Sequence, residues 1–226
     1  MTQKSVLITG AGKGLGNVLV SYFLSQGWCV FGLVRKNDDA LKLEEMGAKA
    51  ILSDVSNDAV KHDIQSVIKS DIAVVINNAG VGGDGKSIIE TSIDDFANSM
   101  NINCFGVLRV TQSVLPLLTT NGLILNISSR FGSISRVASG EFDDISCSYS
   151  YHVAKAAQNM LTQCVSRAYK ETSIRVCSVH PGKIKTEFAS VDADREPIEA
   201  AERIFKLVDT AVTGKFYSLF EGESEW

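Results

Sequence analysis

Residues 9–16 read TGAGKGLG and follow the apolar stretch KSVLIT at residues 4–9. Four of these eight residues are glycines, which let another molecule come close to the backbone because they carry no side chain. The amphipathic segment 15–27 begins inside the stretch and has the pattern of a helix. A strand, a glycine-rich turn and a helix N-terminus in this order are typical of a loop that binds the pyrophosphate of a dinucleotide.

The glycines of this loop have different expected tasks. Gly10 would allow the tight turn, while Gly14 and Gly16 would let a pyrophosphate approach and let the helix pack closely on the strand. The spacing TGxxxGxG differs from the common GxGxxG pattern, so a tight turn without a ligand is the alternative. Lys13 lies among the glycines and indicates a ligand with more negative charge than a pyrophosphate alone.

The rest of the chain alternates short apolar runs with longer amphipathic segments, which predicts βαβ crossovers and an α/β fold with a mostly parallel, doubly wound sheet. Seven strands are expected, at KSVLIT (4–9), CVFGLV (29–34), AKAIL (48–52), DIAVVI (71–76), GLILNI (122–127), IRVCSV (174–179) and KFYSLF (215–220). Helices are expected near residues 15–27, 38–46, 57–69, 94–119, 150–171 and 197–211. We find no domain boundary, so residues 1–226 are expected to form one domain with helices on both faces of the sheet.

Composition excludes several classes of protein. The formal net charge of -4, without a basic patch, argues against binding to nucleic acid. The N-terminus has no secretory signal pattern, and no segment approaches the roughly 20 apolar residues of a membrane span. The five cysteines form no CxxC pair and no metal-like spacing with the three histidines. We therefore expect a cytoplasmic protein with reduced thiols, no metal site and no membrane partner.

Four apolar runs turn abruptly into small or polar residues at their carboxyl ends. The resulting clusters are TGAGKGLG (9–16), NNAG (77–80), ISSRFG (127–132) and HPGKIKT (180–186). In open α/β sheets, ligands bind outside the carboxyl ends of the strands. The four clusters are therefore expected to converge on one crevice.

The stretch YHVAK places Tyr151 and Lys155 four residues apart in a helical segment, on one face of the helix. A free tyrosine has a pKa near ~10, and a nearby ammonium lowers it by favouring the phenolate. The pair would therefore suit proton transfer, although an ordinary pair on a surface helix has the same spacing. Ser128 and Ser129 end the run GLILNI, where a hydroxyl would hydrogen-bond a substrate carbonyl, or would only form a turn or cap a helix.

Together, these segments occur in the order and approximate spacing of the short-chain dehydrogenase/reductase family, which the chain resembles over essentially its whole length. The resemblance implies a single-domain Rossmann fold with a seven-stranded parallel sheet. The ending GKFYSLFEGESEW looks like that of the small NADPH-dependent carbonyl reductases in the family.

The resemblance also implies catalytic roles. Tyr151 would exchange a proton with the substrate oxygen, Ser129 would polarise the carbonyl, and Lys155 would hold the ribose hydroxyls and lower the pKa of the tyrosine. Asn103, in the sequence NCFG, matches the fourth catalytic residue of the family. Asn101 is the competing candidate, but it lacks the glycine three residues later, and a solvated helix residue is the alternative for Asn103.

The cofactor implied by the resemblance is NADP(H). The expected cofactor-binding residues are Gly10, Lys13, Gly14, Leu15, Gly16, Arg35, Asp54, Val55, Asn78, Ala79, Gly80, Tyr151, Lys155, Pro181, Gly182, Ile184 and Thr186. Asp54 would face the adenine, and the segment from Pro181 to Thr186 would meet the nicotinamide carboxamide and the phosphates. A turn residue and a helix cap are the alternatives for Asp54 and Thr186.

The end of the second strand predicts a preference for NADPH. Relatives that use NAD usually carry an acidic residue there, whereas this chain has Val34 followed by Arg35. Arg35 and Lys13 would bind a 2′-phosphate from two sides. The prediction fails if both cations are only solvated, or if Asp38 or Asp39 reaches the ribose.

One feature departs from the family pattern. Ser129 and Tyr151 are separated by 22 positions, wider than the roughly dozen usual in compact relatives, and the extra residues lie around RVASGEFDDISCS (136–148). This insertion is either a solvated loop or a rim of the active site that selects substrates. The segment after Thr186 is short and polar, so the substrate lid expected there would leave an open pocket.

The sequence therefore predicts an NADPH-dependent reductase of a ketone or aldehyde. The alternative is a protein that senses NADP without catalysis, while a sugar-nucleotide epimerase would need a larger C-terminal domain. The segments 94–119 and 150–171 carry apolar residues on more than one side, as in the dimers of the family. The expected partners are a small carbonyl or alcohol substrate and further copies of the chain, in a homodimer or homotetramer.

Overall fold

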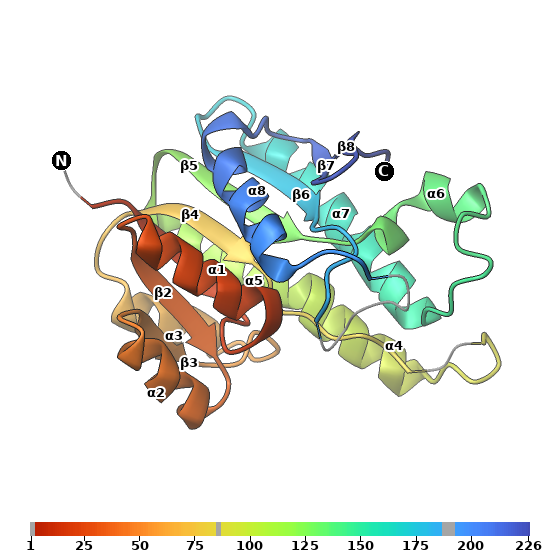
Figure 1. Ribbon diagram of the computed structural model, residues 1–226, viewed down its shortest axis with the longest axis horizontal. Helices are drawn as coiled ribbons and strands as arrows, with labels where there is room; N and C mark the ends of the chain where they lie inside the picture. Colours follow the sequence, from red (N-terminus) through yellow and green to blue (C-terminus); the bar gives the residue numbers. More distant parts are fainter. Residues whose placement is uncertain (1–2, 85–86, 187–192) are drawn as a thin grey trace.

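Seven parallel strands form the centre of the protein (Figure 1). The computed structural model describes residues 3–84, 87–186 and 193–226. The strands are β1 (Ser5–Thr9), β2 (Cys29–Val34), β3 (Lys49–Leu52), β4 (Ile72–Asn77), β5 (Leu118–Ile127), β6 (Arg175–His180) and β7 (Phe216–Ser218). Their order in the sheet is β3-β2-β1-β4-β5-β6-β7, with every neighbouring pair parallel. The predicted doubly wound sheet is confirmed, and a short antiparallel strand that was not expected, β8 (Gly222–Glu223), extends its edge.

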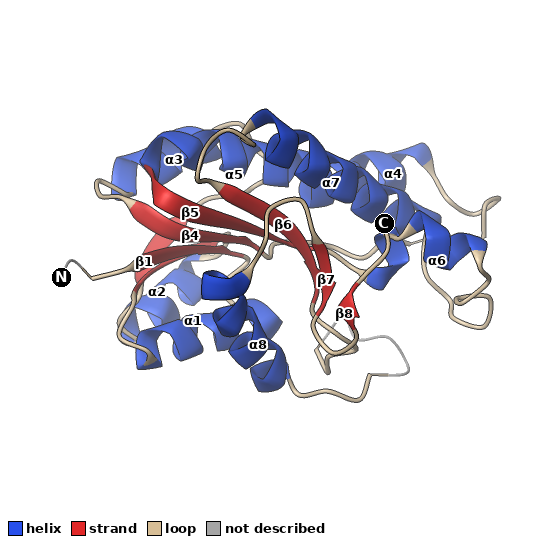
Figure 2. Ribbon diagram, turned by 90° about the horizontal axis from the view of Figure 1, so that it is seen from above, coloured by secondary structure: helices blue, strands red, loops and turns tan. Residues whose placement is uncertain are grey.

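Helices cover both faces of the sheet (Figure 2). One layer contains α1 (Gly14–Ser25), α2 (Asn37–Glu45) and α8 (Pro197–Thr210), and the other contains α3 (Val60–Val67), α4 (Ile93–Met100), α5 (Gly106–Val114) and α7 (Tyr149–Ala168). A short helix, α6 (Ile134–Ala138), lies in the insertion before α7. No helix in the described part of the chain combines the length and the apolar character needed to cross a membrane.

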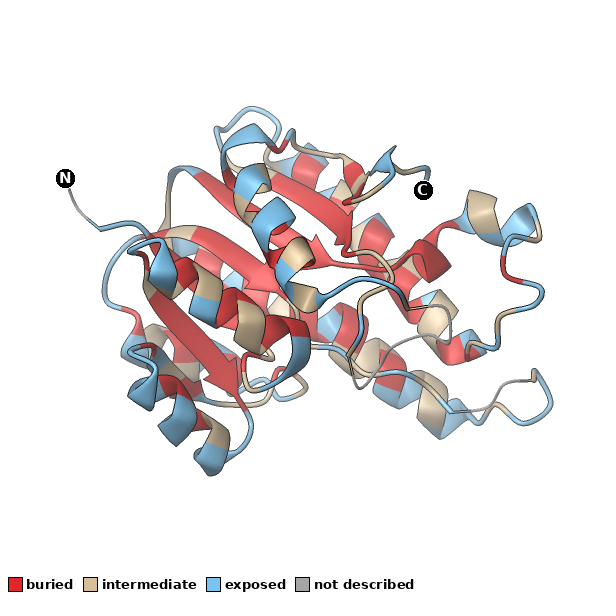
Figure 3. Ribbon diagram, viewed as in Figure 1, coloured by how far each residue is buried: buried red, intermediate tan, exposed pale blue. Residues whose placement is uncertain are grey.

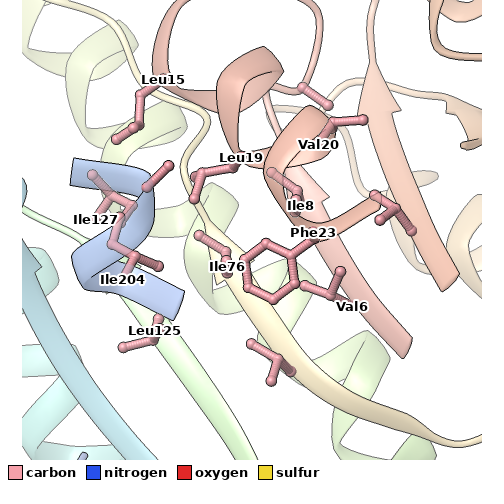
Figure 4. Packing of buried hydrophobic residues seen from close by; sticks show 14 of the residues in the cluster. Val6, Ile8, Leu15, Leu19, Val20, Phe23, Ile76, Leu125, Ile127 and Ile204 are labelled. Atoms are coloured by element: carbon pink, nitrogen blue, oxygen red, sulfur yellow. The ribbon is translucent and has the colours of Figure 1, made fainter. Parts of the chain in front are cut away.

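The apolar runs of the central strands are buried on both faces (Figure 3). In β1, Val6 and Ile8 pack into the cluster between the sheet and helices α1 and α8, together with Phe23 and Ile204 (Figure 4). Leu7 points to the opposite cluster, beneath α3 and α5. Successive side chains of a strand point to opposite faces, so a parallel strand covered on both sides needs a continuous apolar sequence.

The predicted helix 94–119 is interrupted. Helix α4 passes into a π-helical turn, Asn101–Phe105, before α5 begins, and a 3₁₀ turn at Leu115–Leu117 ends the helical segment. Strand β5 starts at Leu118, four residues before the predicted start at 122. Pro116 has no N–H to continue a helix ladder, which is consistent with the early end. The π turn rotates the residues after it relative to α4, and such turns are frequent at functional sites.

Candidate active site

A cavity of about 720 Å³ lies at the carboxyl ends of the central strands. It is lined by residues of all four clusters that follow apolar runs in the sequence, so the predicted convergence is confirmed. Asn103, Ser129, Tyr151 and Lys155 all line it. So do all the predicted cofactor-binding residues except one, namely Gly10, Lys13, Gly14, Leu15, Arg35, Asp54, Val55, Asn78, Ala79, Gly80, Tyr151, Lys155, Pro181, Gly182, Ile184 and Thr186.

The exception, Gly16, shapes the glycine loop from behind. A Cβ atom at this position would overlap the carbonyl oxygen of Gly10, so helix and loop pack this closely only with glycine there. Gly10 itself has a φ of 64°, in the left-handed region that favours glycine. Lys13 is the N-cap residue of α1 and makes no side-chain cap hydrogen bond. The first amides of the helix are thus available to an anion at the cavity wall.

Asn78 fixes the shape of this loop. Its Nδ2 donates to the carbonyl oxygens of Thr9 and Gly10, at 3.0 and 3.2 Å. In return, the Thr9 hydroxyl accepts hydrogen bonds from the backbone amides of Asn78 and Ala79, each at 3.0 Å. The ends of β1 and β4 are therefore tied together directly beneath the cavity.

The structure distinguishes between the two asparagine candidates. Asn103 lies in the π turn and is fully buried. Its Oδ1 accepts a hydrogen bond from the backbone amide of Val81 at 3.2 Å, and its Nδ2 donates to the carbonyl oxygen of Val81 at 3.0 Å. Its Nδ2 also donates to the Ser99 hydroxyl at 3.1 Å. The Asn101 side chain instead donates a hydrogen bond to the carbonyl oxygen of Ser56 and accepts one from the Arg109 guanidinium. Asn101 is not among the described residues that line the cavity.

Ser129, Tyr151 and Lys155 come together from the end of β5 and the start of α7. The Ser148 hydroxyl caps α7 by accepting the amide of Tyr151 at 3.2 Å, which fixes the first turn of the helix. Lys155 is buried, and its Nζ donates to the carbonyl oxygen of Ile127 at 2.8 Å and to Gln158 at 3.0 Å. Nζ lies 5.8 Å from the centroid of the Tyr151 ring.

The electrostatics of this group differ from the expectation that Lys155 lowers the pKa of Tyr151. Burial raises the pKa of Tyr151 to about 12, with a further contribution from Cys147, while a hydrogen bond with Ser129 opposes the shift. Burial also lowers the pKa of Lys155 to about 7, against the effect of Cys104. Desolvation disfavours the charged form of both groups, so Tyr151 keeps its proton at neutral pH.

Charged side chains of both signs surround the far end of the cavity. Arg35 forms an ion pair with Asp54 at 3.7 Å, and Lys36 lines the cavity beside it. Asp39 lies in the first turn of α2, where its Oδ2 would be 2.8 Å from a Cβ at Gly12. In the sequence, Asp39 is only one of two aspartates that would reach the ribose if the NADPH prediction failed. The structure places Asp39 in the cavity lining beside the glycine loop.

The loop after β6 closes the other side of the cavity. Gly182 has a φ of 92°, and a Cβ there would lie 2.6 Å from the Phe220 ring. Ile184 forms an isolated bridge with Arg195, which holds the loop near the start of α8. Residues 187–192, the first part of the segment in which the substrate lid is expected, lie outside the described residues.

Part of the insertion between Ser129 and Tyr151 lies at the rim of the cavity and is not only a solvated loop. Ser146, Cys147 and Ser148 line the cavity, and so do Arg130 and Phe131 in the turn after Ser129. Sequence reasoning did not name these five as site residues, and it also missed His180 at the end of β6. Arg130 and Phe131 follow Ser129 directly and His180 precedes Pro181, so their place in the sequence is the signal that would have found them. Ser146, Cys147 and Ser148 lie three to five positions before Tyr151, which is a weaker signal.

Comparisons with known proteins agree with this geometry. A family model described as short chain dehydrogenase matches residues 4–197. Human 17-beta-hydroxysteroid dehydrogenase type 2 is 31% identical over 213 residues, which cover 87% of this chain and 51% of the human protein. The 3-ketodihydrosphingosine reductase of Bacteroides thetaiotaomicron is 30% identical over 193 residues, covering 83% of this chain and 66% of that enzyme. The chain thus spans about half of the first relative and about two thirds of the second.

Among solved structures, an NADPH-bound carbonyl reductase from chicken fatty liver has a TM-score of 0.88 and 26% identity, with both chains covered completely. The carbonyl reductase Sniffer of D. melanogaster has a TM-score of 0.87 over both complete chains, at 24% identity, and shows the shared fold.

Proposed function

Because this chain belongs to the short-chain dehydrogenase/reductase family, we propose that it is an NADPH-dependent oxidoreductase that reduces a ketone or aldehyde, or oxidises the matching alcohol. The observation that carries the proposal is the meeting of Ser129, Tyr151 and Lys155 in a cavity that also contains the glycine loop. The NADPH-bound carbonyl reductase with the same fold supports it. A protein that senses NADP without catalysis would have no need of these three side chains.

The cavity fits a dinucleotide phosphate. The uncapped N-terminus of α1 and the space beside Gly10 and Gly14 suit the pyrophosphate. Lys13 and Arg35 would bind the 2′-phosphate at the far end of the cavity, and Lys155 would hold the ribose near the reacting group. NADPH, when bound there, supplies the hydride.

The protonation state of Tyr151 favours reduction. Reduction of a carbonyl group would leave a negative charge on its oxygen, and that oxygen would need one proton. Tyr151, with its pKa raised to about 12, holds that proton at neutral pH and would donate it as the general acid. The Ser129 hydroxyl would donate a hydrogen bond to the same oxygen and stabilise its developing charge. Asn103 would keep the Val81 segment in place at the opposite wall.

A substrate screen tests the proposal. Purified protein is mixed with NADPH and a panel of ketones and aldehydes, including a ketosteroid, and the decrease in NADPH absorbance is followed. NADPH affinity is measured separately by titration. We expect tight NADPH binding and turnover of at least one panel compound. Tight binding without turnover of any panel member would instead support a sensor, and absence of binding would contradict both functions.

A further inference from the structure

Lys155 is a buried cation that has no counter-ion within the described ranges. Only 4% of the residue is exposed, and no described carboxylate forms an ion pair with it. Burying an ammonium is costly unless other groups compensate for the water that it loses. The ammonium form of Lys155 therefore depends on neutral oxygen atoms.

Two oxygen atoms hold this ammonium. The carbonyl oxygen of Ile127 accepts a hydrogen bond from Nζ at 2.8 Å, and Gln158 Oε1 accepts a second one at 3.0 Å. Gln158 Nε2 also donates to the Ile127 carbonyl oxygen, at 3.4 Å. Of the side chains that the structure describes, Gln158 is the one that hydrogen-bonds the ammonium.

The amide of Gln158 has no other task in the described part of the chain. Gln158 lies about one turn after Lys155 on the buried face of α7, and only 1% of it is exposed. Burying a glutamine costs the hydration of its amide and the rotamer freedom of a long side chain, and an apolar residue would avoid both costs. Its two polar atoms bond only Lys155 and the Ile127 oxygen that Lys155 also bonds. The amide therefore serves the ammonium.

The third N–H of Lys155 is left for a ligand. An ammonium has three N–H donors, and Ile127 and Gln158 accept two of them. Lys155 lines the cavity, where its Nζ lies 5.8 Å from the centroid of the Tyr151 ring and would lie 3.9 Å from a Cβ at Gly80. Because the ammonium is tetrahedral, two fixed N–H bonds also fix the direction of the third.

We propose that Gln158 is a positioning residue that stabilises the ammonium form of Lys155 and leaves its third N–H to the ribose of NADPH. The inference depends on the proposed function, in which Lys155 holds the ribose, and adds the residue that controls this lysine. Gln158 is not among the described residues that line the cavity, so it would act through Lys155 alone.

Two other titratable groups face Lys155. Tyr151 lies one turn earlier on α7, and Cys104 lies in the π turn and favours the charged form of the lysine. Burial raises the pKa of both groups, so each keeps its proton at neutral pH. The end of β5 and the turn after it contribute backbone atoms, from Ile127 and Gly132.

The acceptor from Gln158 matters because Lys155 is close to losing its proton. Burial lowers the pKa of Lys155 to about 7. Loss of one hydrogen bond to a charged group changes a protonation equilibrium by about tenfold, or about one pH unit. Such a change would alter the fraction of charged Lys155 at neutral pH.

The test measures the titration of Lys155 by NMR in the full chain without cofactor. Lysine is labelled with ¹³C at Cε, and Lys155→Met identifies the signal. Gln158→Leu should lower the pKa of Lys155 by about one unit, because the ammonium loses an acceptor. Gln158→Glu should raise this pKa by at least about one unit, because a carboxylate of the same length replaces the amide. General damage to the site would not shift the two variants in opposite directions.

Thr162→Val is the matched control. Thr162 is fully buried one turn further along the same face of α7, and its hydroxyl bonds Asn126, Ser178 and the backbone of Gln158 but not Lys155. The substitution should leave the pKa of Lys155 within about 0.3 units of the native value, even if it lowers the unfolding temperature.

NADPH affinity connects this titration to the cofactor. If charged Lys155 binds the ribose about tenfold more tightly than neutral Lys155, Gln158→Leu should weaken NADPH binding about threefold at pH 7. Under the same condition, Gln158→Glu should strengthen NADPH binding about threefold at pH 8.

Three results would overturn the inference. An unchanged pKa of Lys155, or shifts in the same direction in both variants, would exclude the role of Gln158 and leave the reductase function intact. Opposite shifts in a native protein that does not bind NADPH would exclude the ribose as the ligand and contradict the proposed function as well. If Gln158→Leu does not fold, Gln158→Glu decides, and a pKa of Lys155 that does not rise would exclude the role of Gln158.

Discussion

The preference for NADPH over NADH depends on a balance of charges at the far end of the cavity, and Arg35→Ala shifts that balance. Lys13 and Arg35 would each make a charge-assisted hydrogen bond to the 2′-phosphate, an interaction of roughly 1.5 to 3 kcal/mol. The Arg35 side chain is 61% exposed and already pairs with Asp54, so the lower value applies. The two cations together would contribute about 3 kcal/mol.

Asp39 acts in the opposite direction. Its carboxylate beside Gly12 would repel a 2′-phosphate and accept a hydrogen bond from the 2′-hydroxyl of NADH. At a separation of about 6 Å in water, one pair of unit charges interacts by about 0.7 kcal/mol, so repulsion from a phosphate is about 1 kcal/mol. The net preference is then about 2 kcal/mol, or about thirtyfold in favour of NADPH. This is smaller than the roughly hundredfold preference that the two cations alone would give.

The assay is kcat/KM for both cofactors with the native enzyme and three variants. Arg35→Ala and Lys13→Ala should each lower the NADPH/NADH ratio by about tenfold, and Asp39→Asn should raise it by about fivefold. Equal use of the two cofactors by the native enzyme would refute the charge balance. A decrease of the ratio in Asp39→Asn would refute the assigned role of that carboxylate.

Three further predictions concern stability, geometry and assembly. The pKa of Lys155 is lowered to about 7 in the folded chain, against 10.5 for an ordinary lysine. Between these two pH values the unfolded chain therefore binds more protons than the folded chain. The free energy of unfolding should rise with pH over this range. In denaturant titrations Lys155→Met should remove about 1 kcal/mol per pH unit of this rise, and an unchanged slope would contradict the shift. Gly132→Ala would place a Cβ 2.8 Å from the Lys155 backbone, so it should destabilise the fold by about 1 to 3 kcal/mol and lower kcat. Gly82→Ala, which meets nothing within 4 Å, is the control, and equal effects of the two substitutions would contradict the close packing. The apolar side chains of Phe105, on the π turn after α4, and of Val153 and Met160, on α7, are exposed, which predicts a homodimer or homotetramer. Met160→Glu should dissociate this oligomer, and light scattering would measure the lower mass. A native protein that is already a monomer would contradict the prediction.

Local patterns predicted the fold and much of the site. The continuous apolar runs located the parallel strands because a strand covered on both faces cannot alternate with polar residues. The turn at Gly10 and the spacing from Tyr151 to Lys155 located the site, because both depend on neighbours in the sequence. The asparagine in an NxxG setting correctly favoured Asn103 as a cavity residue over Asn101.

Features that depend on tertiary packing could not be predicted in this way. The π turn around Asn103 interrupts a segment whose sequence reads as one continuous helix. The pKa of Tyr151 rises rather than falls because burial outweighs the hydrogen bond with Ser129, and burial is not visible in a four-residue spacing. The position of Asp39 follows from the contact of α2 with the glycine loop at Gly12.

The central claim is that Tyr151 transfers the proton in an NADPH-dependent reduction, and Tyr151→Phe tests it most directly. The substitution removes only the hydroxyl, while the Ser148 cap on the backbone amide of residue 151 remains. With a carbonyl compound that the native enzyme reduces, the variant should lose activity by at least about a hundredfold, and its NADPH affinity should stay within about threefold. If the variant keeps more than about a tenth of the native kcat with normal NADPH affinity, Tyr151 is not the general acid of this site.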